Sequence, residues 1–473
     1  MPRTLMVGSE AAPFIKTGGL ADVLGGLPGA LAAIGEQVAV VLPKYRTVQV
    51  SQAERVYQDL PVWLGARNYQ CSVDRAMHQG VPYYFINAPS LYDREGVYNV
   101  GGQDYPDNHL RFAVLCRAAM EISRRIFRAD IFHCHDWQAG LLPLYLHRLG
   151  LADPTFIGAK TLFTIHNLGY QGRFLPNILP EIGLDQSLMR PDLIEFFGDV
   201  NYLKAGLVYS DAINTVSVGY AREIQTPEYG FGLDGLLRSR SADLSGILNG
   251  VDYSDWSPET DRFIPAHFSA ANLTGKATCK RAILDHFGLS AGHPDRPLIG
   301  IVSRFATQKG FDLIADIAPQ LMSEDVSLIV LGSGEPRYEK LFTSLAASYP
   351  DRIAVTIGYN NPLAHLIEAG SDMFLMPSLY EPCGLNQIYS LRYGTIPIVR
   401  ATGGLDDTIE EQTGFKFHPY AGWALLEAIR GALAAFGEPH GWLKMMRAGM
   451  EKDYSWNVSA QAYAALYRRL LAA

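Results

Sequence analysis

The sequence lacks the cysteine patterns that mark several classes of protein. Its five cysteines are Cys71, Cys116, Cys134, Cys279 and Cys383. They are scattered along the chain and form no C-x-x-C pair. An odd number of isolated cysteines indicates neither a disulfide framework nor a zinc knuckle, and it fits a reducing compartment.

Long apolar runs are also missing. No stretch reaches the roughly 18 consecutive apolar residues of a membrane-spanning helix. Gly8, Ser9 and Glu10 interrupt the first apolar run, so no secretory signal peptide is expected at the N-terminus. We therefore expect a cytoplasmic protein with no membrane partner.

Positive charge is scarce as well. The chain has 40 lysines and arginines against 48 aspartates and glutamates, a formal net charge of -8. This balance argues against nucleic acid or an anionic membrane as the main partner, because both need a basic surface. Anionic small molecules remain allowed, since a few local cations can bind them. A length of 473 residues with 48% hydrophobic residues predicts a globular enzyme of two large domains.

Short apolar runs alternate with segments of helical spacing, the pattern of a parallel sheet covered by helices on both faces. In the first half the expected strands are "TLMVG", "VAVVL", "DIFHCHD", "KTLFTIHN" and "DAINTVS". After "GILNGVDYSDWSP" the pattern restarts with "PLIGIVSR", "VSLIVLGSG", "RIAVTIG", "SDMFLMPS" and "TIPIVRATGG". The sequence thus predicts an α/β protein of two doubly wound, Rossmann-like domains, residues 1–243 and 244–456.

Residues suited to chemistry follow the ends of these runs. In an open parallel sheet, ligands bind beyond the carboxyl ends of the strands. In the first domain these positions hold Lys16, Gly18, Gly19, Asp136, Trp137, His166 and Asn167, and in the second they hold Arg304, Lys309, Tyr359, Glu381, Cys383 and Gly384. Together they predict a ligand-binding cleft between two sheets.

The residue types in the second domain suit a sugar diphosphate. Arg304 supplies a planar fork and Lys309 a point charge, which match a diphosphate whose negative charge grows as it leaves. The segment that starts at Gly384 continues as a helix, whose free amides can hold a phosphate. Glu381 precedes this seat and is placed to accept hydrogen bonds from sugar hydroxyls.

The first domain offers a second set. Lys16 with its two following glycines forms another cradle for an anion. His166 and Asp136 are expected to meet the sugar from its other side.

Each of these residues also has a purely structural interpretation. A lysine at a helix start, such as Lys16, is often solvated, and an arginine and lysine pair is common on surfaces. Glu381 is also placed to accept from helix amides. Cys383 is either a nucleophile with a lowered pKa or a small residue in a tight glycine turn. His133 and His135 share a strand face and are either a metal pair or part of a packed, hydrogen-bonded strand.

One familiar motif is present in the wrong context, and another is absent. The segment "GFGLDG" satisfies G-x-G-x-x-G, but it follows "IQTPEY" instead of a buried strand, so a nicotinamide cofactor is not expected. No Asp-x-Asp occurs, so the metal and diphosphate device of one large class of sugar transferases is absent. We therefore expect no metal and no cofactor.

Several blocks of the sequence stand in an order typical of one family. They are "SEAAPFIKTGGLADV", "HCHDWQAGLLP", "TIHNLGYQG", "TPEYGFGLDGLL", "ILNGVD", "SRFATQKGFDL", "IGYN", "EPCGLNQIYSLRYGTIPIVRATGGLDDT" and "GFKF". In these blocks the chain resembles bacterial glycogen synthases and the related plant starch synthases, nearly from end to end. The resemblance implies the two-domain glycosyltransferase fold of the B type. It places the acceptor in the first domain and the nucleotide-sugar donor in the second, with a C-terminal helix at about residues 457–473 packing back on the first.

The resemblance also implies roles for single residues. The implied donor-binding residues are Lys16, Gly18, Gly19, Asp22, Asn249, Tyr359, Cys383, Gly384 and Leu385, with Tyr359 against the adenine ring. The implied catalytic residues are Glu381 and His166 around the glucose, Asp136 in the same pocket, and Arg304 and Lys309 on the diphosphate. Tyr92, Trp137 and Asn167 are implied on the acceptor side, where an aromatic ring stacks on the apolar face of a sugar.

The reaction implied is transfer of glucose from ADP-glucose to the non-reducing 4-hydroxyl of an α-1,4-glucan such as glycogen, with retention at the anomeric carbon. The alternative enzyme is another nucleotide-sugar transferase, with UDP-glucose as donor or with a small acceptor. A glucan phosphorylase would need a lysine bound to pyridoxal phosphate, and a sugar-binding protein without activity is the alternative outside the enzymes. The sequence leaves the oligomeric state, the preferred glucan length and allosteric control open.

Overall fold

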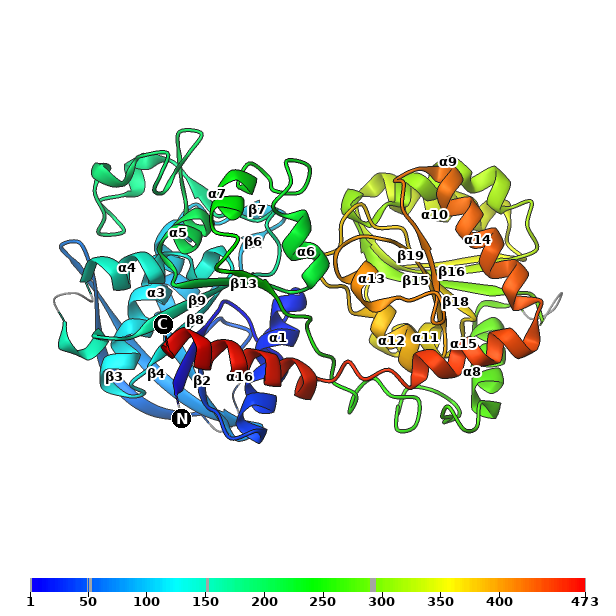
Figure 1. Ribbon diagram of the computed structural model, residues 1–473, viewed down its shortest axis with the longest axis horizontal. Helices are drawn as coiled ribbons and strands as arrows, with labels where there is room; N and C mark the ends of the chain where they lie inside the picture. Colours follow the sequence, from blue (N-terminus) through cyan, green and yellow to red (C-terminus); the bar gives the residue numbers. More distant parts are fainter. Residues whose placement is uncertain (1, 49, 51–52, 150–152, 290–294, 473) are drawn as a thin grey trace. The chain divides into compact units, whose positions relative to one another are not determined.

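The computed structural model describes residues 2–48, 50, 53–149, 153–289 and 295–472. Contacts divide the chain into two compact units (Figure 1). Unit 1 consists of Met1–Val216, Ala221–Gly250 and Trp456–Ala473, and unit 2 consists of Ser217–Tyr220 and Val251–Ser455. The chain therefore leaves unit 1 after Gly250 and returns to it at Trp456.

In the described part of the chain, unit 1 is built on a nine-stranded sheet in the order β14-β13-β9-β8-β1-β2-β5-β4-β3. Its parallel strands are β1 (Arg3–Val7), β2 (Gln37–Pro43), β5 (Val81–Asn87), β8 (Ile131–His135), β9 (Lys160–Ile165), β13 (Ala212–Thr215) and β14 (Leu244–Gly246). All the apolar runs predicted as strands in the first half of the sequence lie in this set. They are buried on both faces because helices cover the sheet from both sides.

A long antiparallel hairpin that the sequence analysis did not predict extends this sheet. It consists of β3 (Glu54–Leu64) and β4 (Arg67–His78), and β4 pairs antiparallel with β5. Both strands mix exposed and buried positions. They therefore lack the continuous apolar run by which the parallel strands were recognised.

The helices of unit 1 are α1 (Gly19–Ala33), α2 (Pro89–Tyr92), α3 (Asn108–Arg125), α4 (Leu141–Leu149), α5 (Tyr202–Tyr209), α7 (Asp234–Ser239) and α16 (Trp456–Ala472). The helix α6 (Val218–Glu223) begins in the short segment that belongs to unit 2. Short strands form a hairpin, β6 (Asn99–Val100) and β7 (Gln103–Asp104), and a small sheet, β10 (Arg173–Phe174), β12 (Asp199–Asn201) and β11 (Glu195–Phe196). Single 3₁₀ turns occupy η1 (Trp137–Ala139), η3 (Pro154–Phe156), η4 (Pro176–Ile178) and η5 (Gln186–Leu188).

The helix α16 is an integral part of unit 1. Its Tyr463 and Tyr467 are fully buried, and the Tyr467 hydroxyl is hydrogen-bonded to Nδ1 of His133 on β8 at 2.8 Å. At the start of the helix, a β-carbon added to Gly26 of α1 would lie 2.1 Å from Nε1 of Trp456. The last helix therefore packs on α1 at a distance that only a glycine permits (Figure 1).

The described residues of unit 2 form a six-stranded parallel sheet in the order β17-β16-β15-β18-β19-β20. The strands are β15 (Leu298–Phe305), β16 (Ser327–Gly334), β17 (Ile353–Ile357), β18 (Met373–Met376), β19 (Ile396–Arg400) and β20 (Phe415–Phe417). Numbered along the chain within the unit, the order is 3-2-1-4-5-6, that of a doubly wound dinucleotide-binding sheet. Every apolar run predicted as a strand in the second half lies in it.

Helices cover both faces of this sheet (Figure 1). They are α8 (Thr274–Phe287), α9 (Phe311–Leu321), α10 (Pro336–Ser348), α11 (Asn361–Gly370), α12 (Asn386–Arg392), α13 (Gly403–Thr408), α14 (Gly422–Phe436) and α15 (Pro439–Met450), with a 3₁₀ turn η6 (Thr307–Lys309) before α9. Along β15, Ile299 and Ile301 belong to the core under α9, α10 and α14, and Leu298 belongs to the core under α8 and α11. Successive side chains of β15 point to opposite faces of the sheet, so this strand contributes residues to the cores on both faces.

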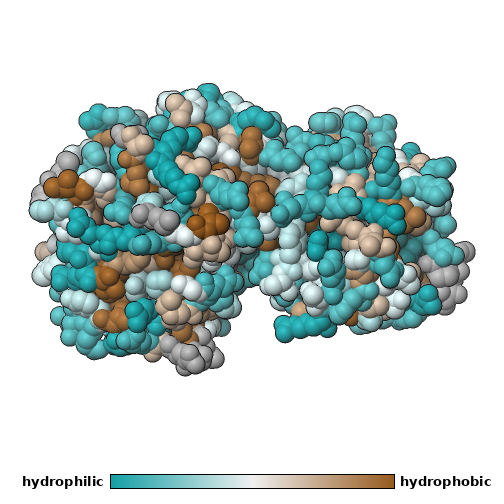
Figure 2. Space-filling view, turned by 60° about the horizontal axis from the view of Figure 1, so that its bottom comes forward, coloured by the Kyte–Doolittle hydropathy of each residue, from teal (hydrophilic) through white to brown (hydrophobic). Residues whose placement is uncertain are grey.

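Among the described residues, no helix combines the length and apolar character needed to cross a membrane. Figure 2 shows that hydrophilic residues cover most of the face in view, with apolar residues in small scattered groups.

Candidate active site

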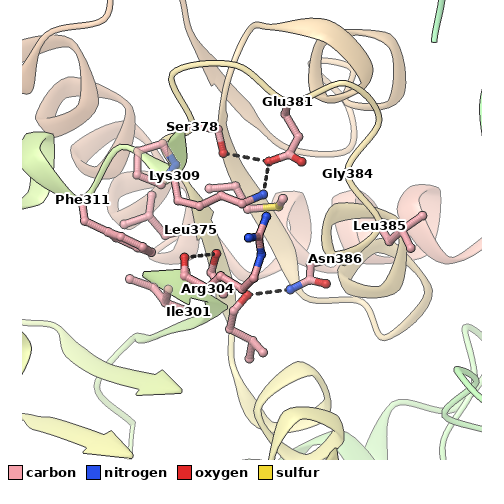
Figure 3. A pocket seen from close by; sticks show the side chains of 14 residues that line it. Ile301, Arg304, Lys309, Phe311, Leu375, Ser378, Glu381, Gly384, Leu385 and Asn386 are labelled. Atoms are coloured by element: carbon pink, nitrogen blue, oxygen red, sulfur yellow. Dashed lines mark hydrogen bonds and ion pairs between the residues drawn. The ribbon is translucent and has the colours of Figure 1, made fainter. Parts of the chain in front are cut away.

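A cavity of about 200 Å³ lies in unit 2 at the carboxyl ends of β15 and β18 (Figure 3). These strands are neighbours in the sheet, at the point where the strand order reverses. Ligands of doubly wound sheets bind at such switch points, because the connections leave to opposite faces and open a crevice between them. The cavity therefore occupies the position that the fold predicts for a ligand.

The structure brings five of the predicted residues together around this cavity. They are Arg304, Lys309, Glu381, Gly384 and Leu385. The lining also includes Ser378 and Asn386, which the sequence analysis did not select. Ser378 is the last residue of the predicted strand "SDMFLMPS", and its place at the carboxyl end of that strand is the signal that could have identified it.

Lys309 and Glu381 form an ion pair inside the cavity (Figure 3). Nζ of Lys309 lies 2.6 Å from Oε2 of Glu381, and the Ser378 hydroxyl donates to the same oxygen at 3.1 Å. The two side chains are only 18% and 9% exposed. Desolvation offsets most of the attraction in such a pair, so stability alone does not account for it. Neither of these bonds uses Oε1 of Glu381, which leaves that oxygen to accept from a ligand.

The loops that carry this pair are locked to each other. Gly310 has a φ of 72°, and a β-carbon there would lie 1.9 Å from the carbonyl oxygen of Pro377. The Leu379 amide donates to the carbonyl of Gln308 at 2.8 Å. The close approach of the two backbones sets the separation of the lysine and the glutamate.

Arg304 lines the same cavity and is exposed. Within the part of the chain that the structure describes, its guanidinium has neither an ion pair nor a hydrogen bond. A planar cation without an internal partner is suited to bidentate contact with a phosphate.

The glycine-rich turn after Glu381 is tightly packed. Gly384 has a φ of 71°, and a β-carbon on Gly404 would lie 2.0 Å from the carbonyl oxygen of Cys383. Cys383 is buried, which agrees with its interpretation as a small residue in a tight turn. The Asn386 amide donates to the Val302 carbonyl at 2.7 Å and ties the start of α12 to β15.

Tyr359 stands apart from the cavity lining. Its ring is 85% exposed just after β17, at the carboxyl edge of the same sheet, and its hydroxyl donates to Oδ1 of Asn361 at 3.0 Å. The structure thus leaves its ring face open, as a stacking residue requires.

In unit 1, the predicted donor residues Lys16 and Asp22 pair with each other. Nζ of Lys16 lies 2.6 Å from Oδ1 of Asp22, and the lysine side chain is 55% exposed. Gly18 and Gly19 have no atom within 4 Å of the position of an added β-carbon. An anion cradle at the start of α1 needs such open space, although the Gly18 amide already donates to Oε2 of Glu10 at 3.1 Å.

Glu10, which the sequence analysis did not select, holds this loop. Its carboxylate accepts from the amides of Thr17 and Gly18, from the Thr17 hydroxyl and from the hydroxyl of Tyr98. Glu10 is 3% exposed. A buried carboxylate with four donors fixes a loop firmly, because removing it would leave buried donors unpaired.

Asp136 and His166 lie next to each other at the carboxyl ends of β8 and β9. Oδ1 of Asp136 accepts from the backbone amide of His166 at 2.7 Å. Burial raises the pKa of Asp136 to about 7, against the lowering effect of backbone amides. Burial lowers the pKa of His166 to about 3, so its imidazole is neutral near pH 7. Asp136 also has a φ of 56°, a strained conformation typical of functional sites.

A chain of histidines continues from this point into the sheet. Nε2 of His166 is hydrogen-bonded to Nδ1 of His135 at 2.9 Å, and His133 bonds both Tyr467 and Thr164. Both ring nitrogens of His133 are therefore occupied, as the packed-strand interpretation requires. Burial holds the pKa of His133 and of His135 well below the usual value. Among the described residues, no group of three or more His, Cys, Asp or Glu side chains is arranged to hold a metal ion.

The expectation for Tyr92 requires a correction. Its ring is 0% exposed and its hydroxyl donates to the Arg111 carbonyl at 2.6 Å, so it belongs to the core and offers no face to a sugar. Trp137 is partly exposed and packs edge-on against Phe112 at 4.8 Å.

Two asparagines of unit 1 complete the predicted set. Asn167 is partly exposed, and its Oδ1 accepts from the Gly169 amide. Asn249 is 6% exposed, and its buried Oδ1 has no hydrogen-bond partner. A buried oxygen of this kind is costly unless something binds it.

Two family descriptions match the chain. Residues 3–239 match "Starch synthase catalytic domain", and residues 290–439 match "Glycosyl transferases group 1". The chain is 52% identical to the glycogen synthase of Koribacter versatilis (strain Ellin345), over 98% of this chain and 96% of that protein. It is 47% identical to the glycogen synthase of Myxococcus xanthus (strain DK1622), over 99% of both.

Two solved structures are similar to the chain over its full length. The catalytic domain of starch synthase IV from Arabidopsis thaliana, bound to ADP and acarbose, superposes with a TM-score of 0.91 at 33% identity, and the match covers 100% of both chains. A sucrose-phosphate synthase from Thermosynechococcus elongatus superposes with a TM-score of 0.59 at 18% identity, covering 100% of this chain and 99% of the other, which shows likeness of fold alone.

Proposed function

The chain belongs to the glycogen and starch synthase family of glycosyltransferases, with the two-domain fold of the B type, and from this premise we propose that it elongates an α-1,4-glucan with glucose from ADP-glucose. The new bond is formed to the 4-hydroxyl at the non-reducing end, with retention at the anomeric carbon. The observation that carries the proposal is the cavity at the switch point of unit 2, where one unpaired cation and one buried ion pair line the same space. Similarity to a starch synthase bound to ADP supports a nucleotide-sugar donor.

We propose that unit 2 binds the donor. Arg304 and Lys309 contact the diphosphate, and Glu381 accepts from the glucose hydroxyls through the oxygen that the lysine leaves unused. Tyr359 stacks on the adenine, and the amides of Cys383, Gly384 and Leu385 lie near the donor. The exposed ring of Tyr359 and the lack of an internal partner for Arg304 support these roles.

The acceptor and further donor contacts are assigned to unit 1. Trp137 and Asn167 are proposed acceptor residues. The other proposed donor contacts are Lys16, Gly18, Gly19, Asp22 and Asn249. His166 and Asp136 are proposed at the reacting glucose, where a neutral imidazole donates or accepts without adding charge.

For the chemical step we propose displacement on one face of the sugar. A retaining transferase usually employs a carboxylate nucleophile and a covalent intermediate. Here Glu381 is committed to a lysine and a serine, so the departing diphosphate takes the proton of the incoming hydroxyl while Arg304 and Lys309 stabilise its growing charge. Mass spectrometry of the Glu381→Gln variant incubated with donor tests this step: no glucosylated protein is expected, and a glucose trapped on another carboxylate would overturn it.

One assay tests the proposed function. Purified protein is incubated with glycogen and either ADP-glucose or UDP-glucose, and the released nucleotide and the size of the labelled product are measured. We expect release of ADP and growth of the glycogen. Preference for UDP-glucose would identify the alternative donor, a small labelled product would identify a small acceptor, and no release with either donor would contradict a transferase function.

We also propose a cytoplasmic location. All five cysteines are buried and none forms a disulfide within the described part of the chain, as in proteins of reducing compartments.

A further inference from the structure

Three buried histidines of unit 1 form a row from the proposed site into the sheet. His133 and His135 lie on one face of β8, with ring centroids 4.0 Å apart, and the centroids of His135 and His166 are 5.2 Å apart. Burial lowers the pKa of each ring, so all three are neutral near pH 7. A neutral imidazole carries one proton, and the partners of its two nitrogens decide which of them holds it.

The partners of His133 fix the position of its proton. Nδ2 of Asn214 donates to the Thr215 carbonyl at 3.5 Å, and Oδ1 of Asn214 accepts from the Thr164 hydroxyl. That hydroxyl has only one hydrogen, so it accepts from Nε2 of His133. Nδ1 of His133 is then the acceptor for the Tyr467 hydroxyl at 2.8 Å. His133 is thus held at both nitrogens and presents a fixed ring face to its neighbour on β8.

The ring of His135 is hydrogen-bonded at one nitrogen. Its Nδ1 lies 2.9 Å from Nε2 of His166, whereas its own Nε2 is buried and has no hydrogen-bond partner among the described residues. A proton on that Nε2 would be a buried donor without an acceptor, and unpaired buried N–H groups are rarer in proteins than unpaired acceptors. This asymmetry favours a proton on Nδ1 of His135, from which it is donated to Nε2 of His166.

The bond determines what His166 offers to a ligand. When Nε2 accepts from His135, the single proton of the neutral His166 ring is on Nδ1. In the described part of the chain, Nδ1 of His166 has no hydrogen-bond partner, and it is not sealed from solvent as Nε2 of His135 is. The open nitrogen of His166 is therefore a donor, which matches a ligand oxygen that accepts, such as that of a sugar hydroxyl.

The main chain and the ring of His166 are held by two successive residues. Its backbone amide donates to Oδ1 of Asp136 at 2.7 Å, and its ring is bonded to His135. β8 and β9 are neighbours in the sheet, with His135 opposite Thr164, so His135 reaches the residue that follows β9 (Figure 1). Asp136 thus sets the position of His166, and His135 sets the orientation of its imidazole.

We propose that His135 is a positioning residue for the transfer reaction: its Nδ1 donates to Nε2 of His166 and keeps the His166 proton on Nδ1, the nitrogen that faces the glucose. The proposal rests on the proposed function for the identity of that ligand. His135 itself touches no substrate, since it is fully buried. Its effect is to have the donor of His166 in place before the sugar binds, so that no change of tautomer precedes the reaction.

Proton–nitrogen correlation spectra of protein with isotope-labelled histidines test the tautomer, because the two neutral forms of an imidazole have different nitrogen shifts. The signal lost in His166→Gln identifies His166. We expect its proton on Nδ1 in the wild type and a mixture of both tautomers in His135→Leu, which removes the donor. His135→Asn is expected to keep the wild-type tautomer, because the asparagine amide places a donor where Nδ1 was.

Steady-state kinetics test the role in the reaction. We expect kcat/KM for ADP-glucose to fall about tenfold in His135→Leu, the loss of one well-placed hydrogen bond, and to recover most of the way in His135→Asn. The matched control is Tyr467→Phe, which removes a buried hydrogen bond from His133 in the same row. This control is expected to lower Tm, as His135→Leu does, and to leave both kcat/KM and the His166 tautomer unchanged.

The outcomes that contradict the proposal are distinct. A proton on Nε2 of His166 in the wild type overturns it, and so does wild-type kcat/KM in His135→Leu. Equal losses of kcat/KM in His135→Leu and Tyr467→Phe assign His135 to the structure alone and also overturn it. If His135→Leu does not fold, the tautomer in the wild type still decides. Wild-type protein that transfers no glucose contradicts the proposed function instead, while its spectra still report where the proton lies.

Discussion

At the scale of single residues, the cavity of unit 2 depends on one ion pair and one free cation. Glu381 is buried and accepts from both Lys309 and Ser378, so its charge is neutralised only while the lysine is present. Removing one partner of a buried pair leaves the other charge without compensation, which costs more than the pair contributes. Lys309 therefore has two tasks, to balance the glutamate and to meet the diphosphate.

The variant Lys309→Ala is expected to lower kcat by about 100-fold, the loss typical of one group that stabilises developing charge. Glycogen affinity is expected to change by less than about threefold, because the glucan is assigned to unit 1. Steady-state kinetics and glycogen binding measure both. The control is Lys452→Ala, which breaks a more exposed pair with Glu410 at 2.8 Å and is expected to leave kcat unchanged. Weaker glucan binding at normal turnover would contradict the assignment.

Asp136 carries a measurable pH signature. Its pKa in the folded protein is about 7, raised by burial from 3.8, so the native state holds a proton that the unfolded chain has lost between pH 4 and pH 7. The native state then binds more protons, and stability falls as pH rises through this window.

We expect the free energy of unfolding of the wild type to fall by a few kcal/mol relative to Asp136→Asn between pH 4 and pH 7, at about 1.4 kcal/mol per unit of pKa shift. Urea unfolding at several pH values measures the difference. His166, whose pKa is lowered, has the opposite sign, but it is present in both proteins and cancels in the comparison. Parallel stability curves would show that Asp136 ionises normally.

Single residues also mark the limit of what the sequence could predict. Strand ends identified Arg304, Lys309 and Glu381 because a parallel sheet brings its carboxyl ends to one edge. Tyr92 was assigned from the family resemblance alone, and a resemblance carries no information on burial, so its place in the core was not predicted.

At the scale of elements, glycines decide how helices approach each other. Gly26 in α1 and Gly441 in α15 are both helical, and helix propensity alone predicts that alanine stabilises either one. Their surroundings differ, because Gly26 faces the Trp456 ring at the start of α16 and Gly441 faces open space.

We expect Gly441→Ala to stabilise the protein by about 0.5 to 1 kcal/mol, as propensity predicts. We expect Gly26→Ala to destabilise it by about 1 to 3 kcal/mol, because the added methyl overlaps a buried indole. Urea unfolding of the two variants side by side measures both. If both were stabilising, α16 would not be packed on α1 as the structure has it.

The strands that could be predicted from the sequence are those buried on both faces. The parallel strands of the two sheets have continuous apolar runs and were recognised for that reason. The hairpin of β3 and β4 has one face in solvent and mixes polar and apolar residues, so its pattern merges with that of loops. Burial on two faces is the physical reason why one group was predictable and the other was not.

At the scale of the whole molecule, the two units have separate interiors. The core of unit 2 centres on residues such as Phe305, Phe311 and Phe342, whose rings pack at centroid distances between 5.2 and 5.4 Å. All of them lie between Val251 and Ser455. Independent cores predict that the units unfold in separate steps.

Scanning calorimetry of the intact chain is expected to show two transitions. Phe342→Ala, which empties a fully buried site in unit 2, is expected to lower one of them by about 10 °C and leave the other in place. ADP is expected to raise the transition that this variant lowers, because the donor is assigned to unit 2. A single transition that moves as a whole would show that the units unfold together.

The return of the chain to unit 1 at Trp456 has a consequence for how the protein is made. The ribosome synthesises all of Val251–Ser455 in unit 2 before it synthesises α16, whose Tyr467 packs on His133. Unit 1 is therefore begun first and completed last. Until then, the sheet of unit 1 lacks the helix that covers His133 on β8. A nascent chain halted near residue 455 would therefore have an incompletely packed unit 1. A chaperone or protease that binds the exposed sheet of unit 1 would in effect detect that α16 had not been synthesised.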